Sequence, residues 1–265
     1  MNISKEMLYV LMGTGFTFLA TAIGASLVFF FKDNMKTSTQ KLFLGFAAGV
    51  MIAASVWSLL IPAINIVNDR HQSVPFIVGG GFILGALFLM LLDSLIPHLH
   101  FVSNETEGIK SSFKRTTLLT FAVTLHNIPE GMAVGIAFVM AVQTPETTPL
   151  MGAIALAIGM ALQNVPEGAA ISLPLKKEGF SNGKAFLYGA GSGFVEPLGG
   201  ILTVLLAGFI TGLMPWILAF AAGAMIYVVV EELIPESNLG EHSNAGTISV
   251  MFGFLLMMML DVMLG

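Results

Sequence analysis

Two short motifs place polar side chains in the middle of long apolar stretches. HNIPEG occupies residues 126 to 131, and QNVPEG occupies residues 163 to 168. Because positions four apart share a face of an α-helix, we expect His126 and Glu130 to point the same way, with Asn127 beside them. An ionised carboxylate at the centre of a bilayer is costly and usually marks a binding site or a pathway. The first motif therefore predicts a functional site rather than a helix kink alone.

The second motif and a third carboxylate extend this predicted site. QNVPEG repeats the arrangement, and GFVEPLGG at residues 193 to 200 adds an acidic residue near the middle of its own stretch. Clustered carboxylates repel one another unless some are protonated or a cation neutralises them. Carboxylates, amides and one imidazole suit Zn²⁺, Fe²⁺, Mn²⁺ or Cd²⁺. The predicted metal-binding residues are His126, Asn127, Glu130, Gln163, Asn164, Glu167 and Glu196.

Prolines accompany all three acidic residues. Inside a helix, proline lacks an amide hydrogen and clashes with the carbonyl four residues earlier. We therefore expect kinks at Pro129 and Pro166. We also expect Pro197, with Gly199 and Gly200 after it, to loosen the third helix.

The rest of the chain is typical of a membrane protein. Of the 265 residues, 55% are hydrophobic and only 10% are charged, whereas soluble domains carry about 25% charged residues. A transmembrane helix needs about 20 mostly apolar residues, because backbone amides in lipid must be hydrogen-bonded within the segment. We predict an all-α polytopic membrane protein, one domain spanning residues 1–265. Its eight transmembrane helices are expected at about residues 8–31, 42–64, 74–96, 116–142, 149–175, 185–214, 215–235 and 247–264.

Basic residues predict the orientation of these helices. The loops after the first, third and fifth stretches hold nine of the 11 Lys and Arg residues, and cytoplasmic loops retain Lys and Arg. These loops are therefore expected in the cytoplasm, with both termini extracytoplasmic. The net charge of −5 argues against nucleic acid as a partner.

Weaker repeats accompany the two PEG motifs in a consistent order. GTGF at 13 echoes GSGF at 191, FAAGVMI at 46 echoes FAAGAMI at 220, and LMLLD at 89 echoes MMMLD at 257. These matches pair stretches 1–3 with 6–8 and stretch 4 with 5. Paired stretches cross the membrane in opposite directions, which predicts inverted-topology repeats and the architecture of an alternating-access carrier.

Other polar residues near helix ends have two interpretations. Asp93 and Asp261 end equivalent stretches and are either entrance or exit ligands or ordinary carboxylates at a wet interface. Glu231 and Glu232 lie near the cytoplasmic end of the seventh stretch, where an exit role is possible. The last pair is His98 and His100, in a loop predicted to be cytoplasmic. These histidines either relay metal or are simply solvated loop residues.

HNIPEG, QNVPEG and the Glu-Pro of GFVEPLGG together resemble the signature of the ZIP (Zrt-/Irt-like protein) divalent metal transporters, in particular the bacterial GufA-like branch. The resemblance implies import of Zn²⁺, and also Cd²⁺, Fe²⁺, Mn²⁺ or Co²⁺, into the cytoplasm without ATP or a cofactor. It also implies a homodimer in a bacterial inner membrane, in which stretches 1, 4, 5 and 6 slide against a scaffold of 2, 3, 7 and 8.

The resemblance further implies a binuclear metal site. One ion would be held by His126, Glu130, Gln163 and Glu167. The second ion would be held by Asn127, Glu130, Asn164, Glu167 and Glu196, so that two glutamates bridge the ions. Some relatives have aspartate where this chain has Asn164, which removes one charge from the second position.

Two other function classes use similar residues. A divalent-cation channel is the first alternative, because a sequence does not reveal whether both gates open together. An intramembrane metallohydrolase is the second. It is disfavoured because the chain has no HExxH motif and only one histidine in a predicted membrane core, whereas catalytic zinc usually takes three firm protein ligands. We therefore predict that the protein is not an enzyme.

Overall fold

The structure is a computed structural model that describes residues 3–30, 37–95, 98–99, 106–107, 115–143, 148–177, 179–210, 212–238 and 244–264. These residues form an all-helical polytopic membrane protein. A short antiparallel hairpin, β1 (His98–Leu99) with β2 (Thr106–Glu107), lies in the loop after the third predicted stretch.

The helices follow the eight predicted stretches. In chain order they are α1 (Ile3–Ser26) with the 3₁₀ turn η1 (Leu27–Phe29); α2 (Thr37–Ala54), η2 (Ser55–Leu60) and α3 (Ile61–Asp69); η3 (Pro75–Gly79) and α4 (Gly80–Leu95); α5 (Arg115–Gln143); α6 (Thr148–Lys177); α7 (Asn182–Gly193) and α8 (Val195–Ile210); α9 (Met214–Val228), η4 (Val229–Leu233) and α10 (Ile234–Asn238); and α11 (Ala245–Leu264). The segments η2, η3 and η4 are π-helical turns.

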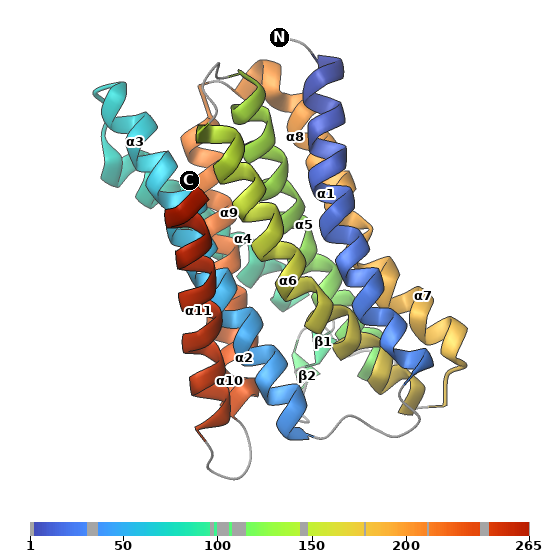
Figure 1. Ribbon diagram of the computed structural model, residues 1–265. Coiled ribbons are helices and arrows are strands. Elements are labelled where there is room, and N and C mark those ends of the chain that lie inside the picture. The colour runs from blue at the N-terminus through green and yellow to red at the C-terminus, as the bar shows by residue number, and fades with distance from the viewer. Residues whose placement is uncertain are drawn as a thin grey trace.

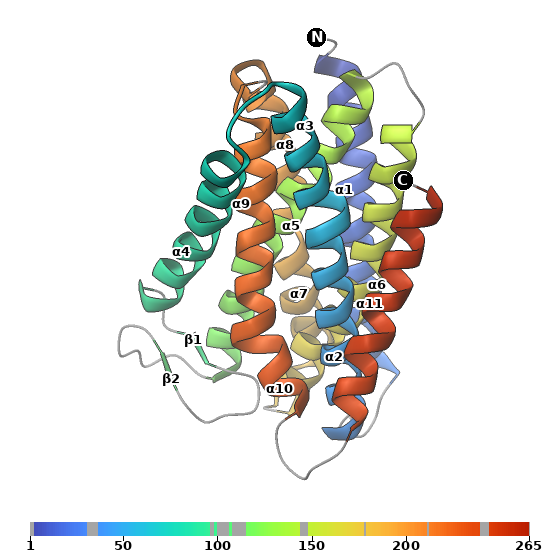
Figure 2. The same ribbon diagram turned by 90° about the vertical axis from the view of Figure 1, so that its left-hand side faces the viewer.

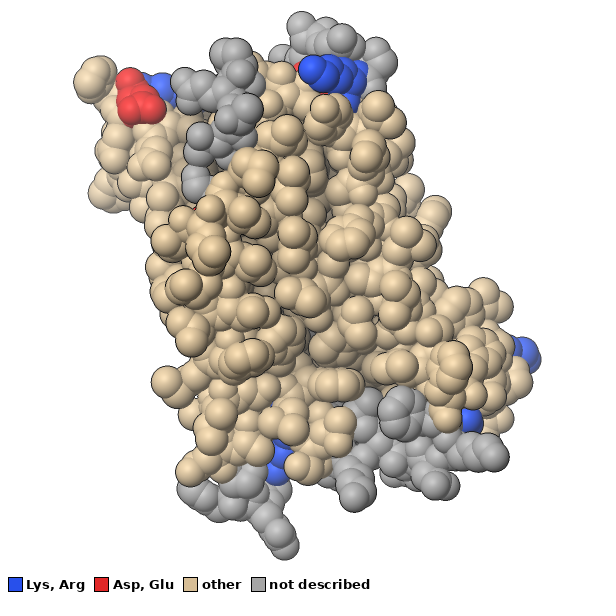
Figure 3. Space-filling model, in the orientation of Figure 1, with Lys and Arg blue, Asp and Glu red and all other residues tan. Residues whose placement is uncertain are grey.

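Five helical segments within the described residues are long and apolar enough to cross a membrane: Lys5–Phe29, Lys41–Asp69, Pro149–Lys176, Met214–Leu233 and Ala245–Leu264. Pro75–Leu91 and Asn127–Gln143 are shorter apolar helices. On the face drawn in Figure 3, charged side chains gather near the two ends of the molecule and leave a wide uncharged band between them. Such a band is suited to contact with lipid tails.

The prolines of the three motifs lie in two different settings. The helices α5 and α6 continue through Pro129 and Pro166. The sixth predicted stretch is instead divided by a turn at Phe194, so that Glu196 and Pro197 lie in the first turn of α8. Proline is tolerated there because the first amides of a helix have no intrahelical acceptor. The positive end of the helix dipole also favours a carboxylate at this position.

The helices form two groups that lie side by side (Figures 1 and 2). The first group contains α1, α5, α6 and α7–α8, with α1 packed on α6 and α5 packed on α8. The second contains α2–α3, α4, α9–α10 and α11, with α2 packed on α11 and α4 packed on α9. The groups meet where α6 contacts α2 and α11 and where α5 contacts α9. Both ends of the chain point toward the same end of the bundle.

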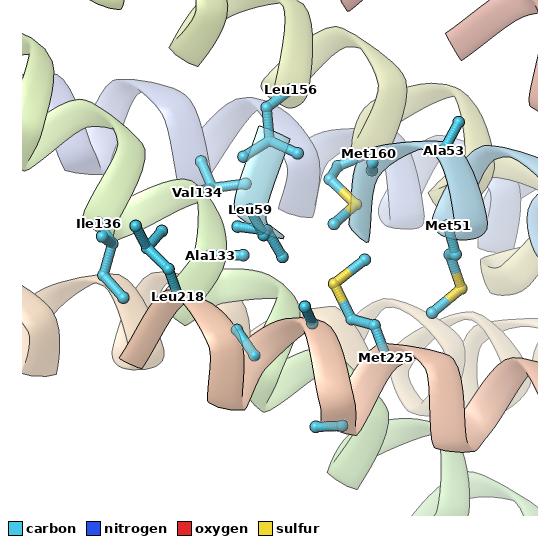
Figure 4. Close-up of a cluster of buried hydrophobic side chains, with 14 of the residues drawn as sticks. Met51, Ala53, Leu59, Ala133, Val134, Ile136, Leu156, Met160, Leu218 and Met225 are labelled. Carbon is cyan, nitrogen blue, oxygen red and sulfur yellow. The ribbon is translucent and has the colours of Figure 1, made fainter. Parts of the chain in front are cut away.

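The contact between the groups is filled by an apolar cluster (Figure 4). Its residues come from α5 and α6 of the first group and from α2, η2 and α9 of the second group. The labelled members are Met51, Ala53, Leu59, Ala133, Val134, Ile136, Leu156, Met160, Leu218 and Met225. The labelled side chains are apolar, so they hold the two groups together by van der Waals contact.

Candidate metal site

Three carboxylates from α5, α6 and α8 converge inside the first helix group. Glu130 is 1% exposed and Glu196 is fully buried, while Glu167 is partly buried. All three carboxyl groups lie close enough to repel one another when they are ionised. The predicted meeting of carboxylates from the three motifs is therefore present in the structure.

Gln163 links the two halves of this cluster. Its Nε2 atom donates to Glu130 Oε2 at 2.7 Å and also donates to Asn164 Oδ1. Asn164 in turn donates from Nδ2 to Glu196 Oε1 at 2.9 Å. Two adjacent amides thus hold two carboxylates in a continuous hydrogen-bonded chain.

The two motif asparagines are anchored by main-chain carbonyls of neighbouring helices. Asn127 donates from Nδ2 to Ser192 O at 3.0 Å, and Asn164 donates to Thr17 O at 3.2 Å. These bonds fix the orientation of both amides. The side-chain oxygens of the two asparagines differ. Asn164 Oδ1 accepts a hydrogen bond from Gln163, whereas Asn127 Oδ1 has no hydrogen-bond partner.

Several buried oxygens of the cluster have no hydrogen-bond partner. They are Asn127 Oδ1, Glu167 Oε1 and Glu196 Oε2. A buried acceptor without a donor costs free energy, and here every unsatisfied atom is an acceptor. This donor-poor pocket has the chemistry that accepts a cation.

A small cavity of about 20 Å³ extends from this cluster toward the second helix group. Its polar lining comes from Glu130, Gln163 and Glu167 on one side and from Glu232 in η4 on the other. Glu232 is 2% exposed, whereas its neighbour Glu231 is partly exposed and does not line the cavity. The structure therefore associates one of the two predicted exit residues with the carboxylate cluster.

A second cavity, of about 480 Å³, lies toward the opposite end of the bundle. It is lined by Trp57, Ser58 and Asn65 from η2 and α3 and by Asp261 from α11, among others. Ser58 donates to Asp261 Oδ1 at 2.7 Å, while Asp261 Oδ2 has no hydrogen-bond partner. Asp261 is 7% exposed, so it does not have the solvated environment of an ordinary interfacial carboxylate.

Other predicted residues lie outside the described structure or its described side chains. His126 belongs to α5, Asp93 to α4 and His98 to β1, but their side chains are not described, and His100 lies outside the described residues. Among the side chains that are described, no group of three acidic or imidazole residues is already arranged to hold a metal. The candidate ligands are instead hydrogen-bonded to one another.

Sequence reasoning missed Thr17, Thr21 and Ser58, whose oxygens contact cluster residues or Asp261. A hydroxyl in an apolar helix is usually satisfied by the carbonyl one turn earlier, so hydroxyl residues give little signal in a sequence. Only the packing of α1 against α6 and α8 identifies the two threonines.

Comparison with known proteins identifies the family. Residues 101–261 match the family described as ZIP Zinc transporter. Zinc transporter ZIP11 of Xenopus tropicalis is 36% identical over 333 aligned positions, which cover 98% of each chain. Zinc transporter GufA of Myxococcus xanthus is 35% identical over 249 positions, covering 93% of this chain and 95% of the relative. Zinc transporter ZIPB of Bordetella bronchiseptica is 36% identical over 267 positions, covering 97% and 82%.

The chain therefore belongs to the ZIP zinc transporter family, which confirms the resemblance carried by its motifs. Membership of a transporter family also confirms that the protein is not an enzyme and rejects the metallohydrolase alternative. It is a multi-pass membrane protein with relatives in bacteria.

Proposed function

We propose that this protein is a carrier that imports Zn²⁺ into the cytoplasm through the carboxylate cluster at mid-membrane. The observation that carries the proposal is the set of unsatisfied buried acceptors on Asn127, Glu167 and Glu196, since a divalent cation satisfies all of them at once. Cd²⁺, Fe²⁺, Mn²⁺ and Co²⁺ have related ligand preferences and are secondary substrates.

Two ions fit the proposed ligand set. The first is held by His126, Glu130, Gln163 and Glu167. The second is held by Asn127, Glu130, Asn164, Glu167 and Glu196. Metal loading then has to break the hydrogen bonds from Gln163 to Glu130 and from Asn164 to Glu196, so that the amides present oxygen and not nitrogen. Ligands that must rotate release an ion more readily than a closed shell of thiolates and imidazoles does.

Equivalent close contacts in the second helix group support the inverted repeat. A Cβ atom at Gly49 would collide with the carbonyl oxygen of Val250, and one at Gly223 would collide with that of Phe82. Gly49 corresponds to Gly223 when FAAGVMI is aligned with FAAGAMI, and Val250 corresponds to Phe82 when MMMLD is aligned with LMLLD. The two contacts are therefore equivalent in the repeat. If the short motifs matched only by chance, there would be no reason for the paired positions to make the same backbone contacts.

The π-helical turns support the same repeat. The turn η2 comes directly before Ile61-Pro62, and η4 comes directly before Ile234-Pro235. A proline that cannot donate to the preceding turn is accommodated by widening that turn. Both repeats therefore place the same local distortion in the helix that faces the carboxylate cluster.

The positions of the cavities favour a carrier over a channel. Along α6, residues 163–170 line the cavity at the carboxylates and residues 149–153 line the cavity at Asp261. Leu156 and Met160 lie between these two sets and belong to the apolar cluster of Figure 4. A packed apolar layer keeps the cavities apart, so an ion passes only when the helix groups move.

The cavities also suggest roles for the outlying acidic residues. Asp261 serves as the entrance ligand in the large cavity, and Glu232 serves as an exit ligand beyond the carboxylates. Asp93, Glu231, His98 and His100 remain candidate exit or relay residues on the cytoplasmic side. Both termini are extracytoplasmic in this arrangement, and residues 1–265 form one transport domain that pairs as a homodimer in a bacterial inner membrane.

Metal flux into vesicles that contain the purified protein tests the proposal. Wild-type protein is expected to carry Zn²⁺ with saturable kinetics, and Glu130→Gln and Glu167→Gln are expected to reduce flux by about 100-fold or more, because each removes a bridging charge. Glu6→Gln is the matched control, since Glu6 is a carboxylate 1% exposed at the end of α1 with a partner, Gln143, outside the cluster. Wild-type flux in both site variants contradicts the proposed site. Flux that rises in proportion to the gradient supports the channel.

A further inference from the structure

Glu196 has a hydroxyl neighbour on α1 that belongs to none of the three sequence motifs. The Thr21 hydroxyl lies 3.3 Å from Glu196 Oε1 and 3.4 Å from Thr17 O, so its one proton is shared between a carboxylate and a carbonyl of its own helix. The Thr17 side chain one turn earlier also lies beside the Glu196 carboxylate. Both threonines are fully buried. The oxygen that receives the Thr21 hydroxyl also receives Asn164 Nδ2, which leaves Glu196 Oε2 unsatisfied.

The contacts of the first helix group place Thr21 in the position equivalent to Glu196. A Cβ atom at Gly168 would collide with the carbonyl oxygen of Thr21, and one at Gly131 would collide with that of Glu196. The glycines are equivalent positions of the two PEG motifs, so Thr21 and Glu196 are equivalent as well. This register differs by three residues from the one given by GTGF and GSGF.

Hydrogen bonds of the asparagines give the same register independently. Asn127 donates to the carbonyl of Ser192, and Asn164 donates to the carbonyl of Thr17. Ser192 lies four residues before Glu196, and Thr17 lies four residues before Thr21. Two kinds of contact thus agree that α1 supplies a hydroxyl where α8 supplies a carboxylate.

The space around Thr21 fits a threonine closely. A Cβ atom at Gly193 would lie 2.8 Å from both Cβ and Oγ1 of Thr21, and Gly168 lies against its carbonyl oxygen. The main chains at Gly193 and Gly168 therefore approach Thr21 closely, and a larger residue at either glycine would collide with it.

We propose that Thr21 is a positioning residue of the metal site, whose hydroxyl fixes the Glu196 carboxylate so that Oε2 faces the bound ion. The inference rests on the proposed function and adds one residue from α1 to it. A hydroxyl at this position orients Glu196 without adding a fourth carboxylate, and so limits the negative charge that the ion must neutralise. Thr21 does not itself have to touch the metal.

Zinc flux and zinc-induced thermal stabilisation of purified Thr21→Val, which keeps the shape and removes the hydroxyl, test the proposal. We expect the KM for Zn²⁺ to rise about five-fold with the maximal rate within about two-fold, because one hydrogen bond to a ligand is lost. Thr21→Ser is expected to restore the wild-type KM. Thr14→Val is the matched control, because Thr14 is also fully buried on α1 and donates to a carbonyl of its own helix, as Thr21 does, but Thr14 does not bond to Glu196.

A double-mutant cycle separates positioning from packing. In a Glu196→Ala background, Thr21→Val is expected to change the KM no further, since the group it positions is gone. Thr21→Ala replaces Thr21→Val in the cycle if the valine variant does not fold. The inference is overturned if Thr21→Val and Thr14→Val have the same KM for Zn²⁺. It is also overturned if Thr21→Val raises the KM by the same factor in the Glu196→Ala background as in the wild type. If wild-type protein carries zinc and Glu196→Ala impairs it while Thr21→Val does not, this inference alone fails and the proposed site stands.

Discussion

The helices α5 and α6 carry nearly the same motif, yet their polar residues are in different states. On α6, Gln163 and Asn164 are hydrogen-bonded to each other and to carboxylates of α5 and α8. On α5, Asn127 is held only through its nitrogen and its oxygen is unsatisfied. The difference shows how a nearly symmetric frame supplies an asymmetric site. Under the proposed function, a metal displaces the hydrogen bonds of the two α6 amides, whereas on α5 the Asn127 oxygen has no bond to lose.

The largest effect is expected from breaking the frame that both motifs share. Gly131→Val and Gly168→Val force side chains into the carbonyl oxygens of Glu196 and Thr21. Forced overpacking of this kind costs about 1–3 kcal/mol or more, and it also separates the helices that carry the ligands. We expect both variants to unfold at lower temperature and to lose zinc flux.

The control for this prediction is Gly191→Ala, in α7, where an added Cβ atom meets nothing within 4 Å. It is expected to behave like the wild type in both measurements. Equal stability of Gly168→Val and Gly191→Ala in thermal unfolding in detergent contradicts the close approach of α6 to α1.

The second prediction compares the two asparagines directly. Asn164→Leu removes hydrogen bonds to Thr17, Glu196 and Gln163, so it is expected to destabilise the metal-free protein by about 2–4 kcal/mol. Asn127→Leu removes the bond to Ser192 and the contact of the amide with Glu167, and is expected to cost less. Thermal unfolding in chelator-treated buffer measures both values. A larger loss for Asn127→Leu reverses the proposed contrast between the motifs.

A third prediction makes the motifs more alike at their first position. His126→Gln gives α5 the residue that α6 has at Gln163, and removes the one imidazole of the proposed ligand set. We expect the preference for Zn²⁺ over Mn²⁺ to fall by about ten-fold, because imidazole favours zinc and amide oxygens favour manganese. Competition flux with both ions measures the ratio. Asn127→Ala is expected to alter this ratio less, and equal ratios in the two variants speak against a selective role for His126.

The sequence predicts the meeting of Glu130, Glu167 and Glu196 better than it predicts the residues around them, and the reason is physical. Carboxylates are so costly in an apolar helix that Glu130 and Glu167 can be identified as candidate site residues from the sequence alone. The eight stretches can be identified because a helix needs a minimum apolar length to cross the lipid. The contribution of α1 is not visible in this way, because a threonine in an apolar helix usually bonds its own main chain, and the Thr21 hydroxyl shares its proton between Thr17 O and Glu196. The position of the helix break is also set by packing, and it falls at Phe194 before the glycines that suggested it.

The smallest effect is expected at the outer cavity, far from either motif. Asp261→Asn keeps the hydrogen bond from Ser58 possible but removes the charge that attracts an incoming cation. Because the final ligands are untouched, the KM for Zn²⁺ is expected to rise by about two- to three-fold at low ionic strength, with an unchanged maximal rate. The effect should shrink as salt is added, since screening weakens attraction by a single charge. Glu6→Gln, which also removes a buried charge at the same end of the bundle, is the control. A salt-independent loss in Asp261→Asn indicates that Asp261 supports the packing of α11 against η2 and has no part in capturing the ion.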